Sequence, residues 1–274
     1  MPNPFAQRSL PATRRGLVFC IPMCAVVVSA TAFAATSTEY YSGTAYDSKG
    51  QELYTESHWS SGEAGETRRL ILFSCPDGKA FARKQVDDAG QVQAPLFELE
   101  DARYGYREGV RLADGGKREV FVRRNAAQTE QSALVESAPR LVIDAGFDRF
   151  IVSHWDALVA GDEQKVDFLL PSRLRTYSFV LKPIGADQID GTPVQRFRLE
   201  LDSWFVFVLP SIDMAYASDT KAIREYSGIS NIRDDNGKNL KVRIEFPADA
   251  RSADVDPHAV TAAAAVRLDG QCKL

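Results

Sequence analysis

Residues 67–87, TRRLILFSCPDGKAFARKQVD, decide the fold of this chain. Two strand-like segments, 67–75 and 79–87, lie on either side of Pro76, Asp77 and Gly78. Glycine adopts a positive φ without a Cβ clash, so Asp-Gly between two such segments is typical of a hairpin turn. The stretch therefore predicts two antiparallel strands joined by a tight turn.

The same pattern recurs in both directions along the chain. Upstream, residues 39–47 and 51–60 flank a Ser-Lys-Gly turn, and downstream, residues 104–112 and 118–124 flank Asp-Gly-Gly-Lys. Further strands are predicted at 163–170, 175–185, 193–209, 221–232 and 239–246. The chain is therefore expected to be mainly β, with antiparallel strands joined by short turns.

One segment, 147–160 (FDRFIVSHWDALVA), has its apolar residues at helical spacing on one face. Asp144 or Asp148 would cap its start, and Gly161 suits its end. The polar side, which includes Asp148, is expected to face water. We therefore predict a strongly curved antiparallel sheet, a half-barrel or nearly closed barrel, with this amphipathic helix packed on it.

The first 34 residues have the three parts of a secretory signal peptide. Three arginines precede an uncharged stretch that ends in Ala32-Phe33-Ala34. We expect cleavage after Ala34 and a periplasmic location. The alternatives are a secreted protein, an uncleaved membrane anchor, or a lipoprotein acylated at Cys20 or Cys24. One curved-sheet domain would follow at 35–250, and then a tail at 251–274 with a short helix after Asp256.

The net charge of the chain limits the classes of molecule that we expect it to bind. The chain has 33 basic and 37 acidic residues, and cleavage would remove three arginines, which changes the net charge from −4 to −7. An acidic chain without a basic block lacks the electrostatic footprint of a nucleic-acid-binding protein. We expect no nucleic-acid partner and no stable membrane span after cleavage. No protein partner is predicted.

Cleavage would also leave two of the four cysteines, Cys75 and Cys272. Two thiols in an oxidising compartment usually pair, and this bridge would hold the tail against the domain. Closure of so long a loop gives a stabilisation of about 4–5 kcal/mol as an upper limit. The alternative is two free thiols.

The chain shows no local pattern for catalysis or for binding a cofactor. His58, His154 and His258 lie in separate segments, and neither a nucleophile-elbow serine motif nor a glycine-rich phosphate loop is present. We therefore expect no metal, no cofactor and no enzymatic activity. Carboxylates at 98–101 and 234–235 fit solvated strand ends better than an acid–base pair.

Two stretches, 101–109 and 226–232, combine glycine with tyrosine and other polar residues. Either the polar side chains line a ligand pocket, or the glycines mark bulged strands. The second interpretation is favoured because bulges are common in curved sheets.

Five motifs together resemble an uncharacterised family of exported proteobacterial proteins. They are D-x-x-x-G-Y-x-E-G at 101–109, F-x-x-F-x-x-x-x-W-x-x-L at 147–158, F-x-L-P-S-R at 168–173, Y-x-G-I-S-N at 226–231 and V-x-I-x-F-P at 242–247. The similarity spans most of residues 38–247 and implies no catalytic residues, since the family has no assigned activity. Its sheet layout looks like the half-barrel of periplasmic lipoprotein carriers, which hold acyl chains in an apolar cavity closed by helices. That analogy concerns the fold alone.

The leading hypothesis is a non-enzymatic protein that binds an apolar or amphipathic, lipid-like ligand between the sheet and helix 147–160. The candidate lining residues are Phe150, Trp155, Trp204, Phe205, Phe207 and Tyr226. For each of them, ordinary core packing is the alternative. A cell-envelope scaffold acting through a sheet edge or apolar patch is the rival hypothesis. A third is a hydrolase, which Ser227 or Ser230 beside His154 would favour.

Overall fold

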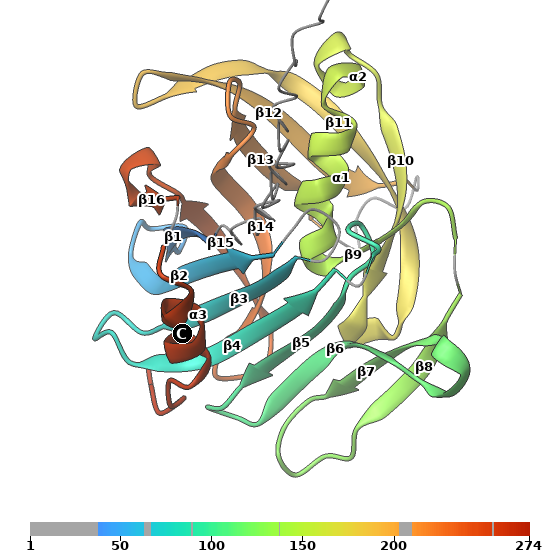
Figure 1. Cartoon of the computed structure of the whole chain (residues 1–274), viewed down its shortest axis with the longest axis vertical. Coiled ribbons are helices and arrows are strands. Elements are labelled where there is room, and N and C mark those ends of the chain that lie inside the picture. Colours follow the sequence, from blue (N-terminus) through green and yellow to red (C-terminus); the bar gives the residue numbers. More distant parts are fainter. Residues whose placement is uncertain (1–37, 63–66, 89, 137, 203–209, 254) are drawn as a thin grey trace, which may run out of the picture. The chain divides into compact units, whose positions relative to one another are not determined.

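One strongly curved sheet of sixteen strands dominates the part of the chain that the structure describes (Figure 1). The structure is a computed structural model, and it describes residues 38–62, 67–88, 90–136, 138–202, 210–253 and 255–274. The strands are β1 (Thr38–Tyr46), β2 (Glu52–Ser61), β3 (Arg68–Ser74), β4 (Ala80–Asp87), β5 (Leu96–Asp101), β6 (Tyr106–Leu112), β7 (Arg118–Arg123), β8 (Gln131–Val135), β9 (Leu141–Ile143), β10 (Gln164–Leu170), β11 (Arg175–Ile189), β12 (Thr192–Leu201), β13 (Ile212–Ala217), β14 (Ile223–Arg233), β15 (Asn239–Glu245) and β16 (Arg251–Ser252). The helices are α1 (Phe147–Ser153), α2 (Trp155–Ala160) and α3 (Pro257–Ala264), with short 3-10 turns η1 (Asp114–Gly116), η2 (Asp144–Gly146), η3 (Pro171–Arg173) and η4 (Ala248–Ala250).

The order of the strands explains how the sheet curves back towards itself. It runs from β8 through β1 to β15 and on to β9, and every neighbouring pair is antiparallel except β9 and β10. The terminal strands β8 and β9 are joined by only five residues, 136–140. Across the same gap, an Arg124 Nη2 donates to the Ser172 carbonyl at 3.1 Å. The two ends of the sheet therefore lie close together, which confirms the predicted curved antiparallel fold.

The hairpin predicted for residues 67–87 is present. The Cys75 amide donates to the Lys79 carbonyl at 2.9 Å, and the Asp77 carboxylate accepts the Lys79 amide at 3.0 Å. Gly78 has a φ of +85°, which glycine adopts without strain. The sequence therefore specified this turn through its Asp-Gly pair.

The predicted helix is present but broken in two. His154 has φ −106° and ψ 14°, between α1 and α2. No side chain caps the helix start at Gly146, and Asp148 accepts a hydrogen bond from the Tyr216 hydroxyl at 2.5 Å instead of facing water. The expected capping by Asp144 or Asp148 was therefore wrong. At the break, the Phe150 carbonyl contacts both the backbone amide of His154, at 3.1 Å, and its ring Nδ1, at 2.9 Å.

Strands β10–β13 bury mainly one face, although Val180 and Ala215 are also buried on the other, and we call them the one-sided wall. Their inner side chains pack against α1 and α2, with Phe197, Leu199 and Met214 almost fully buried. Their outer side chains form ion pairs between neighbouring strands, such as Arg198 with Asp213 at 2.7 Å. This is the alternation expected of a half-solvated antiparallel sheet.

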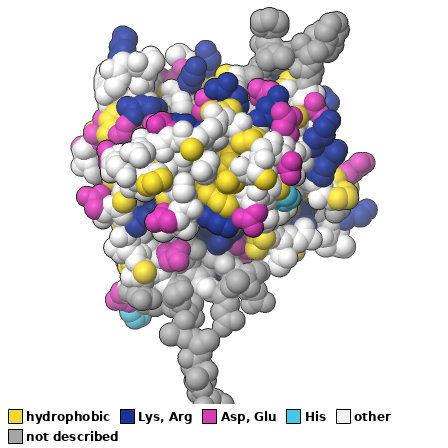
Figure 2. Space-filling model, turned by 90° about the horizontal axis from the view of Figure 1, so that it is seen from above, with side chains coloured by type: hydrophobic (Ala, Val, Ile, Leu, Met, Phe, Trp, Pro, Cys, Tyr) yellow, Lys and Arg dark blue, Asp and Glu magenta, His cyan; other side chains and the backbone are white. Residues whose placement is uncertain are grey.

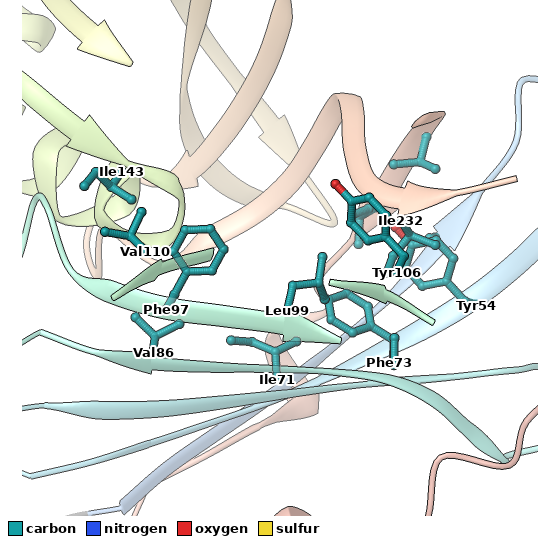
Figure 3. Packing of buried hydrophobic residues seen from close by; sticks show 14 of the residues in the cluster. Tyr54, Ile71, Phe73, Val86, Phe97, Leu99, Tyr106, Val110, Ile143 and Ile232 are labelled. Carbon is teal, nitrogen blue, oxygen red and sulfur yellow. The ribbon is translucent and has the colours of Figure 1, made fainter. Parts of the chain in front are cut away.

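Strands β3–β7 bury both faces, and we call them the two-sided wall. Figure 3 shows Ile71, Phe73 and Leu99 of its inner face in contact with one another. On the outer face, Leu70 and Phe121 are also buried. Helix α3 contacts β3 from that side (Figure 1). Helices α1 and α2 therefore cover part of the inner face of the sheet, whereas the C-terminal tail covers part of its outer face.

The tail is fixed at several points. Cys272 forms a disulfide with Cys75, as predicted, and the Gly270 amide donates to the Ala80 carbonyl at 2.8 Å. The Arg83 guanidinium donates to the Ala264 carbonyl at 2.6 Å, at the end of α3. Residues 251–274 thus belong to the same compact unit as the sheet.

The structure contains strands that the sequence analysis did not predict. They are β5, β8, β9, β13 and the two-residue β16. In β5, Glu98 and Glu100 alternate with Phe97 and Leu99 and point outwards, so the segment resembled a solvated strand end. The end of the predicted strand 193–209, residues 203–209, lies outside the described residues.

Candidate functional site

The inner face of the two-sided wall carries a buried ion pair at its centre. The Lys84 ammonium donates to both Asp144 carboxylate oxygens, at 2.8 and 3.1 Å. Asn231 donates to the same carboxylate at 2.7 Å. The two charged side chains are only 12% and 11% exposed. Three segments that are far apart in sequence therefore meet at one carboxylate.

The Asp144 carboxylate is held in its ionised form. Burial by itself would raise its pKa, but the charge and hydrogen bonds of Lys84 and the hydrogen bond of Asn231 outweigh burial and lower the pKa below its ordinary value of 3.8. Asp144 also has a φ of +39°, a conformation that aspartate tolerates better than most residues. The tight turn before α1 is therefore built around this contact.

A second buried carboxylate, Glu108, lies on β6. The Tyr106 hydroxyl donates to it at 2.5 Å, and an Arg233 Nη2 donates to the same hydroxyl at 2.9 Å. Burial raises the pKa of Glu108, and the nearby Tyr106 and Arg233 offset this only in part. A buried carboxyl with a raised pKa is a feature of many catalytic sites and of structural networks alike.

Other polar groups of the inner face are also paired with one another. His58 binds Glu56 at 3.0 Å and stacks on the Tyr41 ring at 4.3 Å between centroids. The Tyr54 and Ser230 hydroxyls are 2.8 Å apart. These groups satisfy one another, so the interior network accounts for its own charges and is best explained as structural.

The six predicted ligand-lining residues do not all lie in one described cluster. Phe150 and Trp155 are buried among aromatic rings, with the Trp155 and Phe197 centroids 5.5 Å apart. Tyr226 is half-buried, and its hydroxyl donates to the Ile229 carbonyl at 2.6 Å. Trp204, Phe205 and Phe207 lie outside the described residues. The described three thus fill space between α1–α2 and the sheet.

Of the two interpretations offered for the Tyr- and Gly-containing stretches, the bulge is found in 226–232, and a ligand pocket stays a prediction. The register of β14 shifts between Ile229 and Arg233, which confirms a bulge. In the first stretch, Asp101 forms a buried ion pair with Arg103 at 2.6 Å. His154 has Phe150 and Ser153 as its polar partners rather than Ser227 or Ser230. The geometry that would have favoured a hydrolase is therefore not formed by these residues.

An apolar groove of about 470 Å³ lies on the outer face of the two-sided wall, beside α3. Its apolar lining includes Leu70, Leu96, Leu112, Phe121, Val260 and Ala264. Arg68 and Arg111 stand at its rim together with Asp87 and Glu98. The Arg111 guanidinium lies 4.6 Å from the centre of the Phe121 ring, so a cation closes one end of the apolar floor.

A second pocket, of about 380 Å³, is lined by basic residues. Its lining residues are Arg124, Ser172, Arg173, Arg233, Lys238 and Asn239. They come from the end of β7, from η3, and from the β14–β15 hairpin. Sequence analysis missed this pocket because its basic residues are spread over more than a hundred positions.

Comparisons with known proteins give structural similarity alone. A β-barrel-like protein of the domain of unknown function DUF1849, from Brucella abortus, has 10% identity and a TM-score of 0.46, covering 81% of this chain and 98% of that one. A DUF1329 family protein from Desulfovibrio piger has 10% identity and a TM-score of 0.27, covering 81% and 86%. No protein-family model matches the chain, and no curated protein matches it. Both similar structures are named by domains of unknown function.

Two further features, membrane-spanning helices and clusters of metal ligands, concern the described residues. None of their helices has the length and apolar character needed to cross a membrane. Nor do three or more of their His, Cys, Asp and Glu side chains gather where they would hold a metal ion.

Proposed function

We propose that this chain is an exported, non-enzymatic protein of the periplasm that binds an amphipathic, lipid-like molecule. The observation that supports this most is the apolar groove between α3 and the outer face of the two-sided wall. Its volume of about 470 Å³ lies within the range of small-molecule sites. The ligand would therefore lie between sheet and helix, but against α3 rather than against helix 147–160.

The lining of the groove matches an amphipathic ligand. Leu96 is half-buried and Leu112 is 56% exposed, so apolar surface remains available beside α3. At roughly 25 cal/mol per Å², covering such surface gives a favourable binding term. Arg68, 81% exposed along its side chain, offers a charged partner at the rim for a polar headgroup.

The test uses Nile red, a neutral apolar dye, with the purified protein. We expect a saturable rise in dye fluorescence that a lysophospholipid competes away. Replacing Val260 in the groove by glutamate should weaken dye binding at least tenfold, about 1.4 kcal/mol, because a charge is then buried against the ligand. Val159→Glu is the matched control, since Val159 is 46% exposed on α2 and does not line the groove.

Two results would contradict this function. Dye binding that never saturates would exclude a defined site. Equal weakening by Val260→Glu and Val159→Glu would exclude the groove. Export is tested separately, because the protein recovered from the periplasm should begin at Ala35.

A cell-envelope interaction protein is the second candidate, and β8 favours it. This strand ends the sheet in the described residues, and its Leu134 is 60% exposed. Unpaired backbone groups on an edge strand can add a strand from a partner. Crosslinking in cells should then recover a stoichiometric partner that Leu134→Lys removes.

A further inference from the structure

The basic pocket gathers four cations that lack a carboxylate partner. None of Arg124, Arg173, Arg233 and Lys238 forms an ion pair within the described chain. Elsewhere the charges are mixed: Figure 2 shows one face on which basic and acidic side chains lie interspersed. In an acidic chain, this local excess of positive charge is unusual.

The carboxylates closest in sequence to the pocket residues are engaged elsewhere. Asp234 accepts the amides of Asn236 and Lys238 within its own turn. Asp235 accepts the Tyr104 hydroxyl at 2.6 Å. Glu108, which is distant in sequence, is bound by Tyr106, and the charge of Arg233 acts on it without a direct ion pair. The turn carboxylates thus hold the backbone in place, and none of them forms an ion pair with a pocket cation in the described chain.

Two of the three guanidinium groups are held in place before any ligand arrives. Arg233 donates to the Gly237 carbonyl at 2.8 Å and to the Tyr106 hydroxyl, and its guanidinium lies 4.3 Å from the centre of the Tyr106 ring. Arg124 is held by the Ser172 carbonyl. The Nε of Arg233 is buried and has no hydrogen-bond partner. Preorganised donors reduce the entropy lost on binding.

Like charges gathered in one pocket repel one another, and an anion removes that repulsion. We propose that this pocket binds a multiply charged phosphate-type anion, a phosphate monoester or a diphosphate. Guanidinium groups match the geometry of phosphate oxygens, and a singly charged carboxylate would neutralise only one of the four cations. Among the described residues no aromatic ring lines the pocket, so these residues offer a nucleobase nothing on which to stack. The group recognised is therefore the phosphate itself.

Calorimetric titration of the purified protein with pyrophosphate tests the proposal. We expect one saturable site whose affinity falls as salt increases. Lys238→Gln and Arg173→Gln each remove an exposed pocket cation and should raise Kd roughly tenfold. Lys117→Gln is the matched control, because this exposed lysine lies in the β6–β7 turn, at the other end of β7 from Arg124. Absence of binding at millimolar pyrophosphate, or an equal effect of Lys117→Gln, would overturn the proposal.

Two further arms identify the source of the phosphate and separate this site from the apolar groove. Binding to vesicles that contain phosphatidic acid, competed by pyrophosphate, would assign the site to a lipid headgroup. Binding of pyrophosphate without binding to those vesicles would assign it to a soluble ligand. Val260→Glu should leave the Kd for pyrophosphate unchanged, so failure of the groove and failure of this pocket are distinguishable.

Discussion

The one-sided and two-sided walls belong to one sheet but manage polarity in opposite ways. In the one-sided wall, charges stand outside and α1–α2 cover an apolar inner face. In the two-sided wall, Lys84 and Glu108 point inwards, while Leu70 and Phe121 lie buried on the outer face. The comparison teaches that the polarity of a sheet face matches the segment that covers it. Helices α1 and α2 present apolar side chains to the one-sided wall, whereas the η2 turn places the Asp144 carboxylate against Lys84 of the two-sided wall.

The same contrast explains where the candidate sites lie. Paired charges on the outside of the one-sided wall leave it a solvated surface. The two-sided wall needs an outer cover, and α3 covers it only in part, so the apolar groove remains beside α3. Three experiments would break or sharpen this comparison.

The largest effect is expected from breaking the inner ion pair. Lys84→Met leaves the Asp144 carboxylate buried with only Asn231 as partner, so the free energy of unfolding should fall by about 3–5 kcal/mol. Since the folded pKa of Asp144 lies below its ordinary 3.8, the stability it contributes is present above that pH and lost as pH falls through the folded pKa. The loss in Lys84→Met should therefore be greatest at neutral pH, as measured by urea unfolding.

Two controls accompany that measurement. Lys165→Met breaks an exposed pair with Asp202 on the outside of the one-sided wall and should cost at most about 1 kcal/mol. Adding Asp144→Asn to Lys84→Met should recover most of the loss. Equal losses from Lys84→Met and Lys165→Met would show that the two walls do not differ as described.

The second-largest loss of stability is expected when the C-terminal tail is released from the outer face of the two-sided wall. Replacing Cys75 and Cys272 together by serine frees the tail, and the free energy of unfolding should fall by about 2–4 kcal/mol. Hydrogen exchange should show lost protection in β3 and β4 but not in β12, because α3 contacts β3 and the bridge anchors the tail at the β3–β4 turn. Uniform loss of protection across both walls would contradict this.

The smallest effect is expected from Glu108. Burial raises its folded pKa above 4.5, so its stabilising contribution is complete below that pH and is lost as pH rises through the folded pKa. Glu108→Gln removes this loss, and the variant's melting temperature should decline less than that of the native protein between about pH 4 and pH 8. Glu100→Gln, half-exposed on the outer face of β5, should leave the profile unchanged.

Local sequence signals predicted local structure well. The Asp-Gly turn fixed the β3–β4 hairpin, and helical spacing located α1 and α2. The run LILF at 70–73 also indicated burial on both faces of the strand, which we did not predict. Four consecutive buried residues indicate a strand covered on both faces, whereas QRFRLEL at 195–201 alternates as a half-solvated strand does.

The candidate sites could not be predicted in the same way. Lys84 meets Asp144 across 60 positions, and the basic pocket joins Arg124, Arg173 and Lys238 from three separate connections. Such sites depend on which strands become neighbours when the sheet curves, and no local pattern encodes that. The overall charge of −4 even pointed away from a cationic pocket.

The bridge between Cys75 and Cys272 spans 197 positions, and this has a consequence for how the protein matures. A ribosome makes Cys75 directly after the third strand but makes Cys272 only after every described strand. The thiol of Cys75 must therefore stay unpaired, and protected from wrong partners, throughout synthesis of the sheet. Formation of the bridge then marks a chain whose whole sheet has been made, and a truncated chain cannot acquire that mark.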